Sequence, residues 1–328
     1  MRNEQSVIGV DGGGTKTRAV WIRRDGSVLA MAQAGGSNYQ EIGVHGVNAL
    51  LEELVGPWLV NTVESKPACI CLGLAGAGRP TEQRAIKDSV LAREWSDRVR
   101  VESDARAALA GAHAEKRGMI VIAGTGSIVF GIGENGDWVR AGGWGPLLGD
   151  EGSGYDIALR GIRAGLAAHD GSGPDTALSR SLLEELGIKE WAEIVSRVYG
   201  GDLDRPALAS LAPSIMRCAE EGDRVAIAVI RSTAEGLAKQ IAAVSRRSGI
   251  DKEDGLSYCG GLLTGAPLLR YFVEESLRSK GIDMRLMPVR LPAVLGAVVL
   301  AWEHTGSVLG ESELAQLESV AASLLSEA

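Results

Sequence analysis

The chain opens with three short, mainly apolar runs separated by turn residues. Ser6–Val10 ends at a glycine-rich segment, a second run reaches Ile22, and a third, Ser27–Ala32, follows an Asp25-Gly26 pair. Runs of this length between turn residues predict β-strands, and Asp-Gly is a favoured pair in tight hairpins. The opening residues therefore predict a strand, a glycine turn, a strand, a hairpin and a third strand.

The same order of elements recurs further along the chain. Met119–Ala123 runs into a Gly/Thr turn, Ile128–Ile132 follows, and an Asn135-Gly136 pair leads to Trp138–Ala141. Repetition of one supersecondary unit indicates internal duplication. We therefore expect two related lobes, each opened by one copy of the motif.

The rest of the chain alternates strands and helices and then becomes mostly helical, as is typical of an α/β protein. Further strands are expected at 68–74, 99–102 and 256–259, and helices at 41–59, 81–91, 105–114, 155–168, 175–186, 207–221, 224–248, 264–279, 293–304 and 312–325. We expect a first domain at 1–112 and a second at 113–304, joined by a hinge near 110–118. The tail 305–328 could pack back on the first domain.

Composition narrows the class of protein. A chain of 328 residues is long enough for two domains, and 45% apolar with 23% charged residues is ordinary for a globular protein. The formal net charge is −8, and acidic and basic residues are interspersed along the chain. This distribution disfavours a nucleic-acid partner, because phosphate neutralisation needs a basic face. No apolar run approaches the roughly 20 residues that span a bilayer. We expect a cytoplasmic protein without a membrane or nucleic-acid partner.

The four cysteines do not predict a metal site. Cys69 and Cys71 are two residues apart, which suits alternate positions of a buried strand, and Cys218 and Cys259 are isolated. We expect reduced thiols in the core.

The first glycine-rich turn, Asp11–Lys16, lies between two expected strands. P-loops and dinucleotide fingerprints each open a helix, so the turn fits neither motif. Successive glycine amides can converge on an anion, and Asp11 could hold a hydrated Mg²⁺ that neutralises it. The alternative is a tight turn without a ligand. The expected contacts to phosphate oxygens are four consecutive residues: Gly13, Gly14, Thr15 and Lys16.

The second turn has the same chemistry and would meet the phosphates from the opposite lobe. A phosphate clamp of this kind needs both turns, so their occurrence in repeated context strengthens the hypothesis of phosphate binding. The expected contacts are Gly124, Thr125, Gly126 and Ser127.

Asp104 lies between an expected strand and an expected helix. An aspartate at this position is a good helix N-cap, which is the structural interpretation. The functional interpretation is that its carboxylate takes the proton from an attacking hydroxyl, a role that phosphoryl transfer assigns to a positioned aspartate. The sequence leaves both open.

Two dense glycine segments, Gly142–Gly145 and Gly149–Gly154, precede an expected helix. Glycine lets the main chain pass close to a ligand, and Asp150 or Glu151 could accept hydrogen bonds from sugar hydroxyls. The alternative is an acidic segment that caps the helix. Asn38 has a similar ambiguity, since it is a loop amide by default but is suited to a polar sugar.

A last glycine pair, Gly260-Gly261, follows the strand at 256–259. It would let an adenine ring or ribose lie against bare main chain, although the pair by itself is a weak signal.

In its order of motifs the chain resembles the actin/hexokinase/Hsp70 superfamily, and within it the N-acetylglucosamine kinase family, which shares its domain type with the BadF/BadG/BcrA/BcrD ATPases. The resemblance extends from Val7 to Ala301 and implies a two-lobed, actin-like (ribonuclease H-like) α/β fold with duplicated mixed-sheet domains around a central cleft. It is carried by the segments Asp11–Thr15, Ser103–Ala105, Gly124–Ser127, Gly142–Gly145, Gly149–Ser153 and Cys259–Gly261.

The resemblance also implies roles for these residues. The two turns bind ATP phosphates, Asp104 is the catalytic base, and Gly260 with Gly261 holds adenosine. Related kinases are homodimers that close around the substrate. The implied sugar-binding residues are Asn38, Asp104, Thr125, Gly142, Gly143 and Asp150.

Two departures separate the chain from neighbouring groups. It lacks the Cys-x-Cys-Gly-x-x-Gly-Cys zinc motif of the repressor/kinase group of sugar kinases. Activator ATPases of the superfamily bind an iron–sulfur cluster through cysteines that follow the second turn, and Cys218 and Cys259 do not match their positions.

Two hypotheses about function remain at this point. The first is a kinase that transfers the ATP γ-phosphate to the 6-hydroxyl of an amino sugar, most simply N-acetylglucosamine, with glucosamine and N-acetylmuramic acid or a derivative as alternatives. The second is an activator ATPase whose hydrolysis drives a partner protein.

Overall fold

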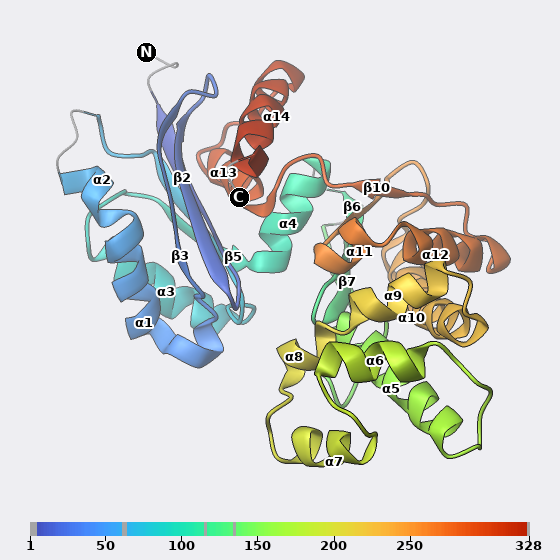
Figure 1. Cartoon of the computed structure of the whole chain (residues 1–328). Helices are drawn as coiled ribbons and strands as arrows, with labels where there is room; N and C mark the ends of the chain where they lie inside the picture. Colours follow the sequence, from blue (N-terminus) through green and yellow to red (C-terminus); the bar gives the residue numbers. More distant parts are fainter. Residues whose placement is uncertain (1–4, 61–63, 115–116, 134–135, 327–328) are drawn as a thin grey trace. The chain divides into compact units, whose positions relative to one another are not determined.

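The computed structural model describes residues 5–60, 64–114, 117–133 and 136–326 (Figure 1). The chain forms two compact units, one comprising Met1–Lys116 with Val289–Ala328 and the other Arg117–Pro288. The expected second domain, 113–304, thus differs from the observed one, because residues 289–304 belong to the first unit. Asn135, assigned to a hairpin turn, lies outside the described residues.

Each unit is built on one mixed five-stranded sheet, and the two sheets have the same topology. Their strand orders are β3-β2-β1-β4-β5 and β10-β9-β6-β7-β8. In the first, β1 pairs antiparallel with β2 and parallel with β4; in the second, β6 pairs antiparallel with β7 and parallel with β9. The strands are β1 (Ser6–Gly12), β2 (Lys16–Arg23), β3 (Val28–Gly35), β4 (Cys69–Leu74), β5 (Val99–Ser103), β6 (Gly118–Ala123), β7 (Ser127–Ile132), β8 (Trp138–Gly142), β9 (Leu256–Cys259) and β10 (Leu286–Pro288). The duplicated α/β fold inferred from the repeat is confirmed.

The helices lie close to their expected positions. They are α1 (Tyr39–Leu54), α2 (Gly56–Val60), α3 (Pro80–Leu91), α4 (Asp104–His113), α5 (Gly154–His169), α6 (Leu178–Leu186), α7 (Ala192–Tyr199), α8 (Arg205–Ala209), α9 (Ala212–Glu220), α10 (Arg224–Ser248), α11 (Gly261–Gly265), α12 (Pro267–Ser279), α13 (Ala293–His304) and α14 (Glu311–Ser326). Three expected helices are each divided in two, and the sequence analysis missed α7 and β10.

Proline explains the division of the expected helix 264–279. Ala266, the residue before Pro267, has φ −121° and ψ 78°, outside the helical region. A proline disfavours the helical conformation of the residue that precedes it, and it is well tolerated in the first turn of a new helix. The chain therefore forms α11 and α12 on the two sides of Ala266.

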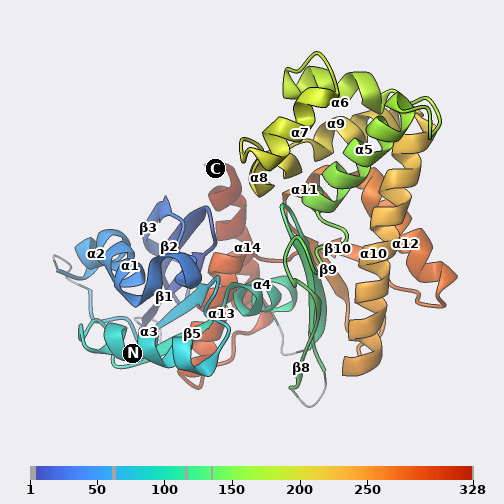
Figure 2. The same ribbon diagram turned by 90° about the horizontal axis from the view of Figure 1, so that it is seen from below.

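In the first unit, helices cover both faces of the sheet. Ile8 and Val10 of β1 pack with α1 and α3, whereas Val7, on the opposite face, packs with α13. Gly9 permits this second contact, since a Cβ there would lie 2.6 Å from the Val294 carbonyl oxygen of α13. The apolar surface of α13 is thus buried on the first sheet, beside which α13 lies in Figure 2. This packing explains why residues 289–304 belong to the first unit and not to the second.

In the second unit, α10 runs along the sheet and organises a largely helical part. Its residues Leu237, Ile241 and Val244 are buried in one core with Met119 and Val121 of β6. The capping residue Asp223 starts α10 by accepting a hydrogen bond from Ala226 N–H at 2.8 Å. The range Arg224–Ser248 expected from the sequence is observed without change.

The cysteines form no disulfide, and Cys69, Cys71 and Cys218 are buried, as expected of core thiols. Burial raises the pKa of the Cys69 thiol to about 11. Within the described part of the chain, no helix has the length and hydropathy needed to cross a bilayer, and no group of three or more His, Cys, Asp or Glu residues could hold a metal ion.

Candidate active site

The first glycine turn joins β1 to β2 and leaves open space on its outer side. Gly13 N–H donates to the Lys16 carbonyl at 3.0 Å, and Ser37 N–H donates to the Gly13 carbonyl at 2.9 Å. A Cβ on Gly14 would meet no atom within 4 Å. Neither Gly13 nor Gly14 has a positive φ, so their backbone conformation does not require glycine. The absence of side chains instead leaves the main chain of the turn accessible to a ligand. Thr15 and Lys16 are exposed beside it.

Two carboxylates of the first unit lie at or just after the ends of their strands, and the charge of one acts on the other. Asp11 is near the end of β1, and Asp104 follows β5. Burial, with the negative charge of Asp104 as the second cause, raises the pKa of Asp11 to about 7. Burial also raises the pKa of Asp104. The site therefore stabilises a proton or a cation at these carboxylates.

Asp104 does not cap the helix that it begins. Ser103 is the N-cap of α4, and its hydroxyl accepts a hydrogen bond from Arg106 N–H at 3.2 Å. Asp104 accepts a hydrogen bond from Ala105 N–H at 2.9 Å through Oδ1. The interpretation of Asp104 as the helix cap is therefore wrong, because the serine before it takes that role.

Asn38 makes local hydrogen bonds with both atoms of its side-chain amide. It is the N-cap of α1, where Oδ1 accepts from Gln40 N–H at 3.2 Å and Nδ2 donates to Glu41 at 2.8 Å. The loop-amide interpretation thus describes this structure, and sugar binding by Asn38 remains a prediction.

In the second unit, the Gly124–Ser127 turn is joined directly to the acidic glycine segment. Gly154 N–H donates to the Gly124 carbonyl at 2.7 Å, and the Ser127 hydroxyl donates to the Glu151 carbonyl at 2.8 Å. A Cβ on Gly124 would meet no atom within 4 Å. Two motifs that are separate in the sequence therefore form one connected site with an open side.

Asp150 forms an ion pair with Arg205, which the sequence analysis missed. Arg205 Nη2 contacts Asp150 Oδ2, and the Asp150 side chain is only 4% exposed. Ser153 caps α5 by accepting from Asp156 N–H at 3.1 Å, so Asp150 is not the helix cap. A lone arginine in a helical region has no local sequence pattern that marks it as part of a site.

Gly142 and Gly143 require glycine for their backbone conformation. Their φ angles are 74° and 68°, a region that other residues rarely adopt. Gln240 of α10 lies against Gly142, where a Cβ would come within 2.8 Å of its side-chain carbon. Its amide donates to the Glu151 carbonyl at 3.1 Å, which ties this segment to the acidic segment.

The two members of the late glycine pair differ in the space beside them. Gly260 has φ 95°, and a Cβ there would overlap the Ala123 main chain, close to the second turn. A Cβ on Gly261, the first residue of α11, would meet no atom within 4 Å. Gly260 is therefore required by the fold, whereas Gly261 has open space beside it.

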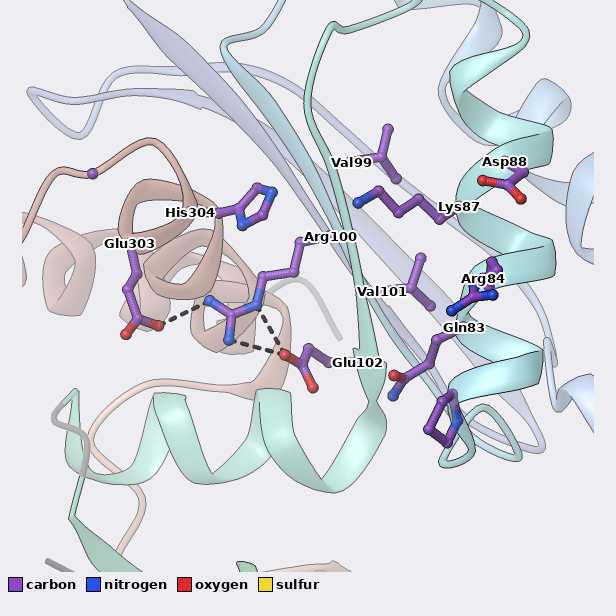
Figure 3. Close-up of a pocket in the computed structure, with 12 residues that line it drawn as sticks. Gln83, Arg84, Lys87, Asp88, Val99, Arg100, Val101, Glu102, Glu303 and His304 are labelled. Atoms are coloured by element: carbon purple, nitrogen blue, oxygen red, sulfur yellow. Dashed lines mark hydrogen bonds and ion pairs between the residues drawn. The ribbon is translucent and has the colours of Figure 1, made fainter. Parts of the chain in front are cut away.

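A separate groove of about 800 Å³ lies in the first unit along the outer edge of β5. Figure 3 shows Arg84 and Lys87 of α3 facing it, and Arg100 between the carboxylates of Glu102 and Glu303, with a nitrogen–oxygen distance of 2.9 Å to each. No residue that the sequence marked as a site residue lines this groove. The groove is therefore distinct from the carboxylate pair and from the glycine turn.

Comparison with known proteins identifies the family. The model of the BadF/BadG/BcrA/BcrD ATPase family matches residues 8–301. The chain belongs to this family.

Individual relatives match nearly the full length of the chain. An N-acetylmuramic acid/N-acetylglucosamine kinase from Clostridium acetobutylicum is 32% identical over 90% of this chain and 97% of its own length. An N-acetyl-D-glucosamine kinase from Dictyostelium discoideum is 30% identical over 91% of this chain and 98% of its own length. The crystal structure of a Chromobacterium violaceum protein, proposed to be an N-acetylglucosamine kinase, has a TM-score of 0.68 at 28% identity, covering 91% of this chain and 99% of that protein.

Proposed function

We propose that this protein is an ATP-dependent kinase that phosphorylates the 6-hydroxyl of an amino sugar, with N-acetylglucosamine as the first candidate. The observation that carries the proposal is Asp104, a half-buried carboxylate that follows β5 and is not needed as a helix cap. The kinase names of the two full-length relatives support the same reaction.

Asp104 is the proposed general base. A carboxylate with a raised pKa holds a proton more tightly, and is therefore a better acceptor for the proton of the attacking hydroxyl. Its Oδ1 is oriented by Ala105 N–H at 2.9 Å. The remaining carboxylate oxygen, Oδ2, would accept the proton as the oxygen of the sugar attacks phosphorus.

Asp11 is the proposed Mg²⁺ residue. Mg²⁺ is often held by one or two carboxylates, waters and substrate phosphates, and Asp11 would supply one carboxylate to it through a water molecule. Burial and the charge of Asp104 raise the pKa of Asp11 to about 7, although the positive charges of Arg18 and Lys16 act in the opposite direction. A bound cation would stabilise the ionised carboxylate. Bound Mg²⁺ would neutralise charge on the phosphates of ATP.

The open surfaces of the two glycine turns support the phosphate contacts, and the remaining assignments follow from the resemblance to the kinase family. Gly13, Gly14, Thr15 and Lys16 would contact ATP phosphates in the first unit, and Gly124–Ser127 would do so in the second. Gly260 and Gly261 would hold adenosine. The proposed acceptor contacts are Asn38, Asp104, Thr125, Gly142, Gly143 and Asp150.

The identity of the amino sugar is the finer part of the proposal. The Clostridium relative is named for both N-acetylmuramic acid and N-acetylglucosamine, so N-acetylmuramic acid is the second candidate. Glucosamine is the third, supported by a Vibrio cholerae glucosamine kinase with 28% identity over 69% of this chain. We further propose that the enzyme acts in the cytoplasm as a homodimer.

The direct test is coupled ADP release by the purified protein with Mg-ATP and each sugar in turn. Stimulation by an amino sugar, with a 6-phosphate detected in the product, supports the proposal. Hydrolysis at one rate with every sugar would contradict it and favour the activator ATPase.

A further inference from the structure

Arg205 is held at the second-unit site by the start of a short helix. Asp204 caps α8 by accepting a hydrogen bond from Ala207 N–H at 2.8 Å, and Pro206 occupies the first turn. These two neighbours fix the backbone from which Arg205 extends. Its position is therefore set locally and does not depend on the ion pair alone.

The guanidinium of Arg205 reaches both motifs of the site. Nη2 contacts Asp150 Oδ2, and a Cβ placed on Gly126 would overlap the same nitrogen. The Arg205 side chain is 38% exposed, against 4% for Asp150. The guanidinium thus lies between a buried carboxylate and the surface of the Gly124–Ser127 turn, with part of its own surface open to solvent.

Two opposing influences act on the carboxylate of Asp150. Burial raises its pKa, and the positive charge of Arg205 is the largest influence that lowers it. Main-chain N–H groups of Gly145 and Ser127 also lower the pKa, whereas the charge of Glu151 raises it. Without Arg205, the protonated carboxyl group would be favoured over a wider range of pH.

Among the described residues, Arg205 has one hydrogen-bond donor without an acceptor. Its Nε–H group is buried and has no hydrogen-bond acceptor among the described residues. A buried donor without an acceptor is destabilising, and such groups in native proteins call for an explanation in function or structure.

We propose that Arg205 is a positioning residue for the acceptor sugar, which keeps the Asp150 carboxylate charged and oriented to accept hydrogen bonds from sugar hydroxyls. The inference rests on the proposed function, because it assigns Asp150 to the acceptor. Arg205 then affects the sugar more than ATP, although it lies beside a turn assigned to phosphate.

The kinetic test compares Arg205→Gln with Arg205→Lys. We expect Arg205→Gln to raise the KM for the sugar by at least about tenfold, as for the loss of one charge-assisted hydrogen bond, with a smaller change in the KM for ATP. In Arg205→Gln, the acidic limb of the pH profile of kcat/KM for the sugar should move to higher pH. Arg205→Lys keeps the charge and should restore that limb.

A matched control separates these effects from general loss of an ion pair. Arg231 of α10 pairs with Glu275 of α12 at 2.6 Å on the exposed surface of the same unit. Arg231→Gln should leave the sugar KM and the pH profile unchanged. If Arg205→Gln also left the sugar KM and the pH profile unchanged, the inference would be overturned. It would also be overturned if Arg205→Gln changed the KM values for sugar and ATP equally and Arg205→Lys did not restore them, because the Arg205–Asp150 ion pair would then be structural.

A second measurement does not need kinase activity. The carboxyl ¹³C signal of Asp150, assigned by its absence in Asp150→Asn, is titrated in the unmodified protein and in Arg205→Gln. A higher midpoint in Arg205→Gln supports the electrostatic step, and an equal midpoint overturns it. This result is independent of the acceptor, so failure of the proposed function would be recognised separately, by the absence of sugar-dependent ADP release in the unmodified protein.

Discussion

The negative charge of Asp104 adds to burial in raising the pKa of Asp11 to about 7. The two carboxylates belong to segments far apart in the sequence, one ending β1 and the other beginning α4. Carboxylates that repel each other share protons or attract a cation, as in sites that bind metal or carry out acid–base chemistry. The proposed function therefore assigns its chemistry in the first unit to this pair.

Replacement of Asp104 tests its role as the base. Asp104→Asn removes the proton acceptor but keeps the size of the side chain, so we expect kcat to fall at least about 10²-fold while ATP binding is retained. Sugar-dependent ADP release and ATP titration by calorimetry measure the two effects. Ser103→Ala, which removes the actual helix cap, should lower thermal stability with a much smaller effect on kcat. Normal turnover in Asp104→Asn would exclude the general-base assignment.

Replacement of Asp11 tests the buried charge through the pH dependence of stability. The folded-state pKa of about 7 lies above the ordinary aspartate value of 3.8, so the folded protein binds the proton more tightly than the unfolded chain does. The contribution of this proton to the free energy of unfolding is fully present below the unfolded-state pKa, and it is lost as the pH rises through the folded-state pKa. At about 1.4 kcal/mol per pKa unit, the loss is on the order of a few kcal/mol.

We therefore expect Asp11→Asn to become more stable relative to the unmodified protein as pH rises from 5 to 8 without nucleotide or Mg²⁺. Denaturant unfolding at each pH measures the difference. Asp88→Asn, at an exposed carboxylate of α3, is the control and should change stability little at any of these pH values. Parallel stability curves for Asp11→Asn and the unmodified protein would show that Asp11 carries no raised pKa.

The glycine pair before α11 offers a matched comparison. Gly260→Ala should destabilise the protein by about 1–3 kcal/mol, because φ 95° is strained for alanine and the Cβ overlaps Ala123. Gly261→Ala meets no atom and should leave the melting temperature within a few degrees of the original. If the pair holds adenosine, Gly261→Ala raises the KM for ATP. An unchanged KM in that variant would remove the adenosine assignment.

The first turn can be tested in the same manner. Gly14→Val places a side chain in space that is open in the structure, without a positive φ to strain it. We expect little change in thermal stability and at least about a tenfold rise in the KM for ATP, since the side chain would displace a phosphate contact. Equal KM values for Gly14→Val and the unmodified protein would show that phosphate does not lie on this turn.

The sequence predicted the fold better than it predicted the side-chain pairs. Strand and helix positions follow from apolar periodicity and turn residues, which are local properties, so α10 and β9 were placed at their observed bounds. The domain boundary was missed because α13 carries apolar residues all round, and such a helix does not reveal from its own sequence which sheet it covers.

In the candidate site, too, the sequence predicted local features but not contacts between distant residues. Glycine-rich turns are visible in the sequence because their chemistry is local, and the structure shows that Gly14 and Gly124 have open space. Arg205 was missed because its ion pair with Asp150 joins residues 55 positions apart. The structural interpretation that the sequence left open placed the N-cap of α4 at Asp104, one residue too late, since Ser103 and Asp104 are both good caps by type and only geometry distinguishes them.

The most direct measurement is ADP release by the purified protein with Mg-ATP, in a panel of hexoses, amino sugars, N-acetyl sugars and muramic derivatives. An amino-sugar kinase should show strong stimulation by one or two N-acetylated amino sugars, loss of that stimulation in Asp104→Asn, and a 6-phosphate as product. ATP hydrolysis that is the same with and without every sugar would contradict the kinase assignment and favour an activator ATPase.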